Sequence, residues 1–517
     1  MKNLIAVLFA SALLFSCSRK ADTPAQENNP ATAQNLKSKT EINQFIRQTF
    51  NQNGHFEWQT ASDEIIWSAG EQTDHVFAVG FKPAGERTDI KDIIHTIDIK
   101  SGAWKQAKDE LLNLALQMER TQNAALTPEK MMAFPEEILP VADLYIRDLN
   151  TIKMLRRSNL VRYVEPMGYE PDGAAEVVSR ELSSSGCGGY DQDFSLVAGS
   201  DYSNISPAAK QSWNHSFHGV SNAWAKGATG QGVKVFILDS GISPDQDNFG
   251  SQFNQGSSAG RTIEKIVTLP RNTFLGIPIG SVETPADGCG HGTAMAGACA
   301  APRGTDGNAA GIAYNCNLVT CRGAADVFLD ESRESKGVAD GYTNAANRAD
   351  VKIISMSMGR ITSSSQISDA INYAYGKGKL MFCAGGTSFG WSAGWVGVIF
   401  PAWLSNVNAV TGVKDNLNTR CNACHSGSEI DFTIVMEKAA NERHALTTPM
   451  TGNQPGTVGG SSVATAQCAG IAALVWSRFP TYTRDQVRSK MVTTASNYPT
   501  ASSSFGWGRV NADAATN

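Results

Sequence analysis

Five short apolar runs recur along the C-terminal part of the chain, separated by segments of helical or loop composition. They are 233–238, 316–321, 351–358, 379–386 and 407–413. Because few polar residues interrupt them, the runs are typical of strands buried on both faces of a parallel sheet that helices cover. The pattern predicts an α/β domain with a mostly parallel sheet flanked by helices over residues 208–517.

The segment 363–378 between two of these runs has helical periodicity. Its apolar residues fall on one face and are Ile367, Ala370, Ile371, Ala374 and Tyr375. Ser363 and Gln366 have the spacing of a capping box, and Gly376 is a typical helix stop. We therefore expect a helix that begins after Ser363.

Residues 70–167 predict a smaller unit of mixed α and β structure. Strand candidates lie at 75–82, 141–148 and 160–166, with a helix at 104–118 and a short helix at 151–158. The unit contains no polar constellation suited to catalysis, so we expect a structural or inhibitory role. Before it, the polar composition of residues 17–69 is typical of a tether with one short helix near 41–50. After it, residues 168–207 are rich in Gly, Ser and Asp and predict a linker or an N-terminal extension.

The first seventeen residues have the character of an export signal. An apolar run from Leu4 to Phe15, too short to span a bilayer, is followed by a small residue directly before Cys17. The ending LFSC resembles the lipobox of bacterial lipoproteins, which implies a signal peptide over 1–16 and a diacylated Cys17. An ordinary signal peptide with a chance cysteine is the alternative. We expect an exported protein of the bacterial cell envelope, anchored to a membrane through lipid on Cys17.

Length, charge and cysteine content narrow the function classes. A chain of 517 residues predicts two or three folded units. The 44 basic residues are balanced by 49 acidic ones without long single-sign runs, which argues against a nucleic-acid partner.

Of ten cysteines, nine follow Cys17, so at least one of these is expected to lack an intramolecular disulfide partner. The motif CNACH at 421–425 has the spacing of a c-type haem site, but its surroundings favour a local disulfide or free thiols.

Three residues of the C-terminal domain lie in settings suited to nucleophilic catalysis. Ser462 lies in a Gly-Gly-Ser-Ser turn that begins a small-residue helix, whose N-terminal amides favour negative charge. His291, with glycine on both sides, is a candidate for the base that a serine nucleophile needs. Asp239 directly follows the run 233–238 and is a candidate for orienting that base. Taken singly, the three also fit a helix cap, a structural histidine and a loop cap.

Together and in this order, the three sites resemble the active-site motifs of the subtilisin-like serine proteases, the subtilases. The motifs are VKVFILDSGI, HGTAMAGACA and GGSSVATAQCAG. The order Asp, His, Ser fits this family and differs from that of the α/β-hydrolases. The resemblance covers about residues 208–517. It implies that Ser462 attacks the scissile carbonyl, His291 transfers the proton and Asp239 holds the imidazole tautomer.

The resemblance also implies binding groups around the nucleophile. The backbone amide of Ser462 would donate to the oxyanion. Ser357, Met358 and Gly359 would form the strand edge on which an extended peptide lies. Gly386 stands where the family has the asparagine of the oxyanion hole. Thr387 or another nearby donor therefore substitutes for it, or the enzyme is slow or inactive.

The ending LVRYVEP of the 70–167 unit resembles the last strand of subtilase inhibitory propeptides. Those domains assist folding and block the cleft until they are cut off, so this unit is expected to be a partner of the catalytic domain. A cut within 168–207 would release a soluble enzyme or leave it attached by non-covalent binding or by a disulfide from Cys187.

The sequence supports two functions of different classes. The first is an exported serine endopeptidase that acts on proteins or peptides through an acyl-enzyme. The alternative is a weak or inactive pseudoprotease that binds peptides or proteins. No cofactor is required; calcium is common in the family, but the loop 245–250 lacks a ligand and no metal site is identifiable. Trp391, Trp395 and Phe400 lie in a segment that, by resemblance, borders the specificity pocket, so they favour apolar substrates or simply pack in the core.

Overall fold

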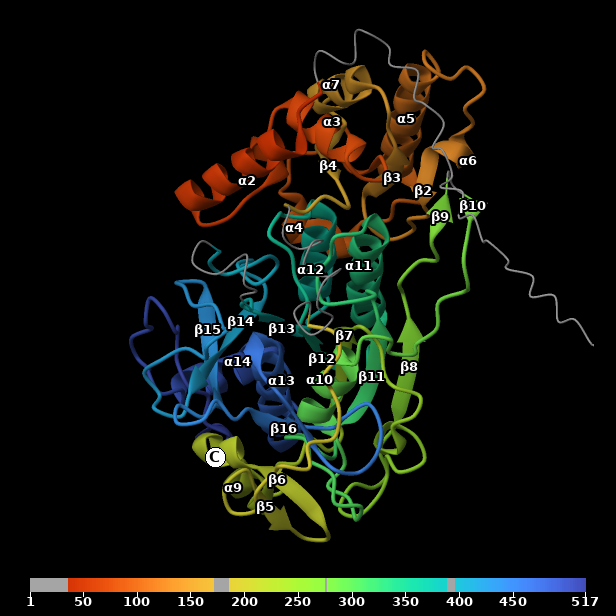
Figure 1. Cartoon of the computed structure of the whole chain (residues 1–517). Helices are drawn as coiled ribbons and strands as arrows, with labels where there is room; N and C mark the ends of the chain where they lie inside the picture. The colour runs from red at the N-terminus through yellow and green to blue at the C-terminus, as the bar shows by residue number, and fades with distance from the viewer. Residues whose placement is uncertain (1–35, 172–185, 275–276, 388–395) are drawn as a thin grey trace, which may run out of the picture. The chain divides into compact units, whose positions relative to one another are not determined.

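Seven strands form a parallel sheet at the centre of the C-terminal domain (Figure 1). The computed structural model describes residues 36–171, 186–274, 277–387 and 396–517. The strands lie in the order β15 (Ile430–Glu437), β14 (Asn408–Lys414), β13 (Leu380–Ala384), β12 (Val351–Met356), β7 (Lys234–Asp239), β11 (Asn317–Arg322) and β8 (Ile263–Val267). Every neighbouring pair is parallel. The five predicted strands and the α/β fold class are confirmed, while β8 and β15 were not predicted.

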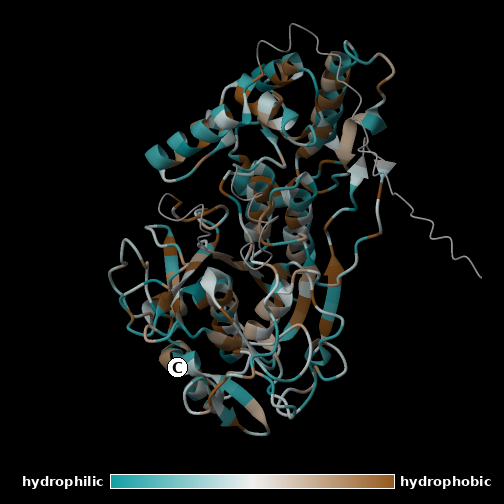
Figure 2. Ribbon diagram, viewed as in Figure 1, coloured by the Kyte–Doolittle hydropathy of each residue, from teal (hydrophilic) through white to brown (hydrophobic). Residues whose placement is uncertain are grey.

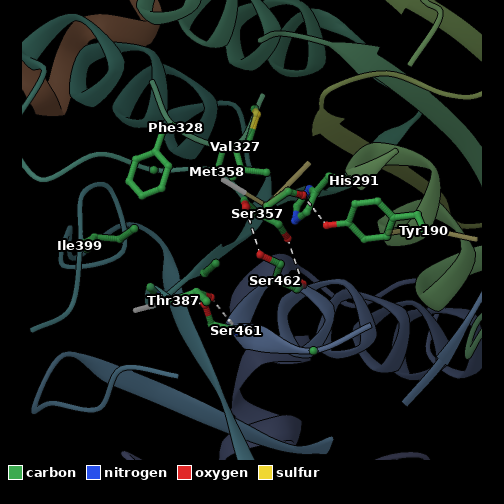
Figure 3. A pocket seen from close by; sticks show the side chains of 15 residues that line it. Tyr190, His291, Val327, Phe328, Ser357, Met358, Thr387, Ile399, Ser461 and Ser462 are labelled. Atoms are coloured by element: carbon green, nitrogen blue, oxygen red, sulfur yellow. Dashed lines mark hydrogen bonds between the residues drawn. The ribbon is translucent and has the colours of Figure 1, made fainter. Parts of the chain in front are cut away.

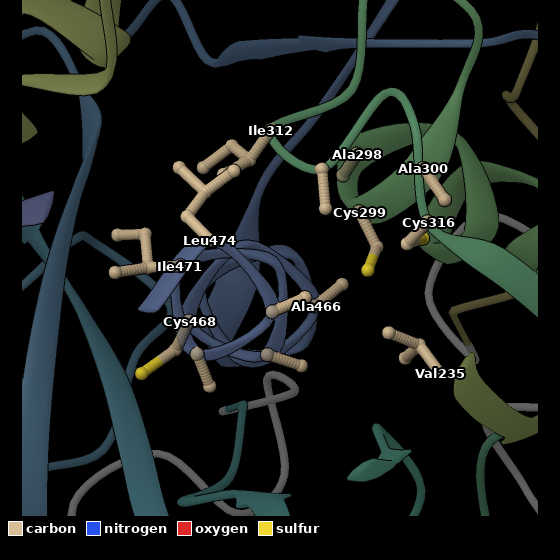
Figure 4. Packing of buried hydrophobic residues seen from close by; sticks show 14 of the residues in the cluster. Val235, Ala298, Cys299, Ala300, Ile312, Cys316, Ala466, Cys468, Ile471 and Leu474 are labelled. Atoms are coloured by element: carbon tan, nitrogen blue, oxygen red, sulfur yellow. The ribbon is translucent and has the colours of Figure 1, made fainter. Parts of the chain in front are cut away.

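Helices cover both faces of this sheet because successive strand residues point to opposite sides. In β7, Val235 and Ile237 belong to the core that holds α10 (His291–Ala300) and α13 (Gly460–Arg478). Phe236 and Leu238 belong to the other core, with α11 (Ser332–Asn347) and α12 (Ser365–Gly376). Figure 4 shows α13 end-on, with Val235 on one side and Cys468 on the other. In Figure 2 the apolar residues concentrate in the strands of the central sheet.

The predicted helix after Ser363 is present as α12, with a different cap. Ser364 is its N-cap and accepts from the amide of Ile367. The hydroxyl of Ser363 instead accepts from the amide of Trp58, a residue of the N-terminal domain. The capping-box prediction at Ser363 is therefore wrong by one residue, because a long-range contact uses that hydroxyl.

The N-terminal domain is an antiparallel sheet with its own helices and apolar core. The sheet order is β2 (Met132–Phe134), β3 (Val141–Tyr145), β1 (Val76–Phe81) and β4 (Val161–Pro166). The helices are α2 (Lys39–Asn53), α3 (Asp63–Glu71), α4 (Ile90–Ile93), α5 (Gly102–Glu119), α6 (Pro128–Met131) and α7 (Leu149–Arg157). All five elements expected between 75 and 166 are confirmed.

The short helix expected near 41–50 is confirmed as α2, but the described part of the segment 17–69 is folded and is not a tether. Ile42, Ile46 and Phe50 of α2 are buried in the same core as the sheet of this domain. A capping box of Ser38 and Glu41 fixes the helix start, and the i, i+4 spacing of the apolar residues gives it one buried face. The folded N-terminal domain therefore includes the described residues from Ser38 onward.

Shorter elements complete the C-terminal domain. They are β5 (Tyr202–Ile205), β6 (Ala209–Ser212), α9 (Val220–Ala225), β9 (Thr273–Phe274), β10 (Ile277–Pro278), β16 (Ala445–Thr447), β17 (Gly456–Val458), α14 (Arg484–Thr493) and α15 (Ala512–Ala515). Disulfides join Cys187 to Cys289 and Cys421 to Cys424. The second of these confirms the local disulfide at CNACH.

Candidate active site

Asp239 and His291 form a buried hydrogen-bonded pair at the carboxyl end of β7. The distance from His291 Nδ1 to Asp239 Oδ1 is 2.7 Å, and the two side chains are only 4% and 1% exposed. The amide of Ser240 donates to the same Asp239 oxygen. Because a buried carboxylate needs hydrogen-bond donors, these two contacts hold the carboxylate in place and set the direction of the imidazole.

A second aspartate, Asp287, shapes the loop that leads into α10, and our sequence analysis did not identify it. Its carboxylate accepts from the hydroxyl of Ser240 and from the amides of Cys289, Gly290 and Thr293. These bonds connect the loop after β7 to the start of the helix that carries His291. The available signal was an acidic residue just before a helix N-terminus, where the helix dipole favours negative charge.

Ser462 is the third residue of α13 and lines the same cavity, of about 160 Å³, as His291 (Figure 3). Gly460, at φ +86°, makes the tight turn that starts the helix. The hydroxyl of Ser462 donates to the carbonyl of Ser357 at 3.3 Å, whereas the described contacts include no bond from it to His291. Catalytic hydrogen bonds are often longer before substrate binds, so this geometry is compatible with a Ser-His relay.

The predicted substrate edge is already paired within the protein. Gly359 N–H donates to the carbonyl of Val327 at 3.1 Å, and its carbonyl accepts from the amide of Leu329 at 3.2 Å. Ser357 donates through its hydroxyl to the carbonyl of Ser462, and Met358 is buried. An extended peptide can add to Gly359 only after residues 327–329 have moved from this edge.

Gly386 lies in a conformation that leaves no room for a side chain. Its φ is +122°, and a Cβ built there would lie 2.4 Å from His425 Nδ1. Burial lowers the pKa of His425 to about 4, so this imidazole is neutral at pH 7. The amide of Gly386 donates to Ser461 Oγ at 3.1 Å. Thr387 lines the cavity and also contacts that hydroxyl, at 3.1 Å.

Tyr190 is a further residue of this cavity that our sequence analysis missed. Its ring contacts His291 edge-on, with centroids 6.0 Å apart, and its hydroxyl donates to the carbonyl of Gly186. The disulfide from Cys187 to Cys289 fixes this segment beside the loop before α10. Nothing in the local sequence around Tyr190 signals this long-range placement.

Several expectations lie away from the cavity or outside the described residues. Phe400 is fully buried in the core, so it packs there, while Trp391, Trp395 and Cys17 are not described. Within the described ranges, no three His, Cys, Asp or Glu side chains come together as metal ligands. In the same ranges, no helix has the length and apolar character needed to span a membrane.

Comparison with known proteins places this geometry in a family. The family model described as the subtilase family matches residues 230–508, more than half of the chain. The chain belongs to the subtilase family. It is similar to alkaline elastase YaB of Bacillus sp. (strain YaB), with 33% identity over 57% of this chain and 67% of that protein. It is also similar to a thermostable alkaline protease of Halalkalibacterium halodurans, with 32% identity over 59% of this chain and 73% of that protein.

Two further comparisons cover similar parts of the chain. Subtilisin BL of Lederbergia lenta is 30% identical over 56% of this chain and 93% of that protein. The crystal structure of MycP1 from Mycobacterium smegmatis aligns with a TM-score of 0.45 and 21% identity over 63% of this chain and 89% of that chain. Family membership makes this subtilase a serine-type endopeptidase whose substrates are proteins or peptides.

Proposed function

We propose that this subtilase cleaves peptide bonds through Ser462, His291 and Asp239 by way of an acyl-enzyme. Ser462 Oγ attacks the scissile carbonyl while His291 Nε2 takes its proton, and the same imidazole later protonates the leaving amine. Asp239 holds the proton on Nδ1 and stabilises the imidazolium that forms. The buried 2.7 Å contact between Asp239 and His291, beside Ser462 in one cavity, is the observation that carries this proposal.

The start of α13 supplies electrostatic stabilisation in this mechanism. The amide of Ser462 belongs to the first turn, whose N–H groups have no partners within the helix. Together with the positive end of the helix dipole, this amide favours the oxyanion that forms on the attacked carbonyl.

A fluorophosphonate probe tests this proposal against a pseudoprotease. We expect the processed protein to be labelled, and mass spectrometry to identify Ser462 as the labelled residue, because only an activated serine reacts readily. Loss of labelling in His291→Ala would show that the base is needed. Correctly processed protein that takes up no probe would favour the binding module instead.

The N-terminal domain is proposed to act as an inhibitory propeptide. It contacts α12 directly: Arg162 forms a bidentate pair with Asp369, and Glu165 accepts from the amide and hydroxyl of Ser365 at the helix start. Glu170 pairs at 2.9 Å with the fully buried guanidinium of Arg360, the residue after Gly359. We infer that the domain stabilises the paired, closed form of the substrate edge.

Release of this domain is expected to depend on pH. Burial raises the pKa of Glu165 and of Asp143 to about 7, and both face α12 in the complex. Since exposed carboxyls titrate near pH 4, association takes up protons between roughly pH 4.5 and 7. Binding is therefore tightest below that window, weakens by up to about tenfold per pH unit for each group within it, and then levels off.

Gel filtration of the protein cut between its two domains, from pH 5 to 8, measures this effect. We expect the domain to co-elute at pH 5 and to separate more at pH 7. Glu165→Gln mimics the protonated carboxyl and should make the profile shallower. Separation that increases as the pH falls would contradict the assignment.

We also propose that the protein is exported and carries a lipid on Cys17. The position of the processing cut then decides whether the catalytic fragment is released from the membrane. Cys187 and its partner Cys289 lie 102 residues apart. A cut before Cys187 leaves both cysteines on the catalytic fragment, whereas a cut between Cys187 and residue 207 leaves the fragments joined. Immunoblots of membrane and soluble fractions, with and without reductant, distinguish the two. We expect soluble catalytic fragment without reductant; a single uncut species would contradict processing.

A further inference from the structure

Beside Ser462, the chain lacks the side-chain donor that the family's asparagine supplies to the oxyanion. Gly386 has no side chain that could donate, and its φ of +122° and the nearby imidazole of His425 leave no space for one. Its amide is already used by Ser461 Oγ. A substitute for the asparagine side chain must therefore come from a neighbouring residue of the cavity.

The hydrogen bonds of Ser461 and Thr387 show which of their two hydroxyls is free to donate to the oxyanion. Ser461 Oγ accepts from the amide of Gly386, and Thr387 Oγ1 accepts from the amide of Ser461 at 3.3 Å. The two hydroxyl oxygens lie 3.1 Å apart, where either can be the donor. Ser461 is fully buried, and among the described residues only Thr387 offers its hydroxyl hydrogen an acceptor. Because an unsatisfied buried hydroxyl is unfavourable, Ser461 donates to Thr387.

This arrangement leaves the hydroxyl hydrogen of Thr387 for another partner. Thr387 is only partly buried and lines the cavity with Ser462. A Cβ built on Gly460 would lie 2.9 Å from Thr387 Oγ1, so this hydroxyl lies against the turn that starts α13. Figure 3 shows Thr387 and Ser461 on the side of Ser462 away from His291. A donor there faces the side opposite the base.

We propose that the hydroxyl of Thr387, oriented by the relay from Gly386 through Ser461, is the second oxyanion donor of this enzyme. It is a catalytic residue that binds the oxygen of the tetrahedral intermediate together with the amide of Ser462. This inference rests on the proposed function, because it needs Ser462 to be the nucleophile. It resolves the absence of the family's asparagine without predicting an inactive enzyme.

Thr387→Val and Thr387→Ser test the donor, since valine keeps the shape of threonine without the hydroxyl, whereas serine keeps the hydroxyl and loses only the methyl group. We expect kcat for a chromogenic peptide to fall by about 10²–10³ in Thr387→Val, the loss measured for one such donor in a subtilisin of this same family. KM should change little, because the interaction forms mainly in the transition state. Thr387→Ser should stay within about tenfold of wild type.

The outcomes separate this inference from the proposed function. Equal kcat in Thr387→Val and wild type would overturn the inference, as would equal losses in the valine and serine variants. A wild-type protein that neither cleaves peptide nor reacts with the fluorophosphonate would overturn the proposed function itself. If Thr387→Val does not mature, Thr387→Ala against Thr387→Ser gives the same comparison of a site with and without the hydroxyl.

Discussion

Ser462→Ala is expected to lower kcat for peptide hydrolysis by about 10⁶-fold, a magnitude measured in a subtilisin of the same family. The substitution removes the only atom proposed to form the acyl-enzyme, and the remaining groups can only polarise the substrate and bind it. Residual rate above that in water then reflects the α13 amide and binding alone. Steady-state kinetics on a chromogenic peptide, with the processed enzyme at high concentration, measures the loss.

Ser461→Ala is the matched control, because the two serines are adjacent on the same turn. Ser461 is fully buried and orients Thr387 in our proposal, so its loss should lower kcat much less than the loss of Ser462. Equal kcat losses in the two variants would point to a damaged turn. Retained activity in Ser462→Ala would remove the nucleophile assignment.

The central sheet could be predicted from sequence where strands are buried on both faces. Five of its strands are continuous apolar runs, and all five are present. The two strands that were missed lie at the edges of the sheet. In β8 Lys265 is exposed and the other residues are only partly buried. In β15 the polar residue Asp431 interrupts the apolar run, and its carboxylate binds Arg488 and the amide of Ala409. Edge positions tolerate such polar residues, which weakens the sequence pattern.

The site itself was predictable only as far as its local motifs extend. Each of Asp239, His291 and Ser462 lies in a motif of a few residues, and the structure brings all three to the carboxyl end of the sheet. The imidazole of His425 fills the space beside Gly386, although the two residues are 39 apart in the chain, and no local sequence pattern predicts this contact. The same reason hid Tyr190 and the pairing of Gly359 with Val327.

Asp239→Asn is expected to lower kcat by about 10⁴-fold while leaving the fold intact. The amide has almost the same shape as the carboxylate but carries no charge to stabilise the imidazolium. Ser240 and His291 both bond to Oδ1, so an NH₂ group in that place opposes the amide of Ser240 and favours the tautomer with the imidazole proton on Nε2, which cannot accept the proton of Ser462. The loss should therefore appear mainly in kcat.

Asp245→Asn is the control for this prediction, because Asp245 is exposed in the loop after β7 and makes no contact with His291 among the described interactions. It should keep wild-type kcat, and both variants should melt within a few degrees of wild type. A kcat for Asp239→Asn within tenfold of wild type would mean that the 2.7 Å contact is structural. A large loss with an unchanged melting temperature would instead separate the electrostatic role of Asp239 from its packing, since only the charge and the donor pattern differ between the two side chains.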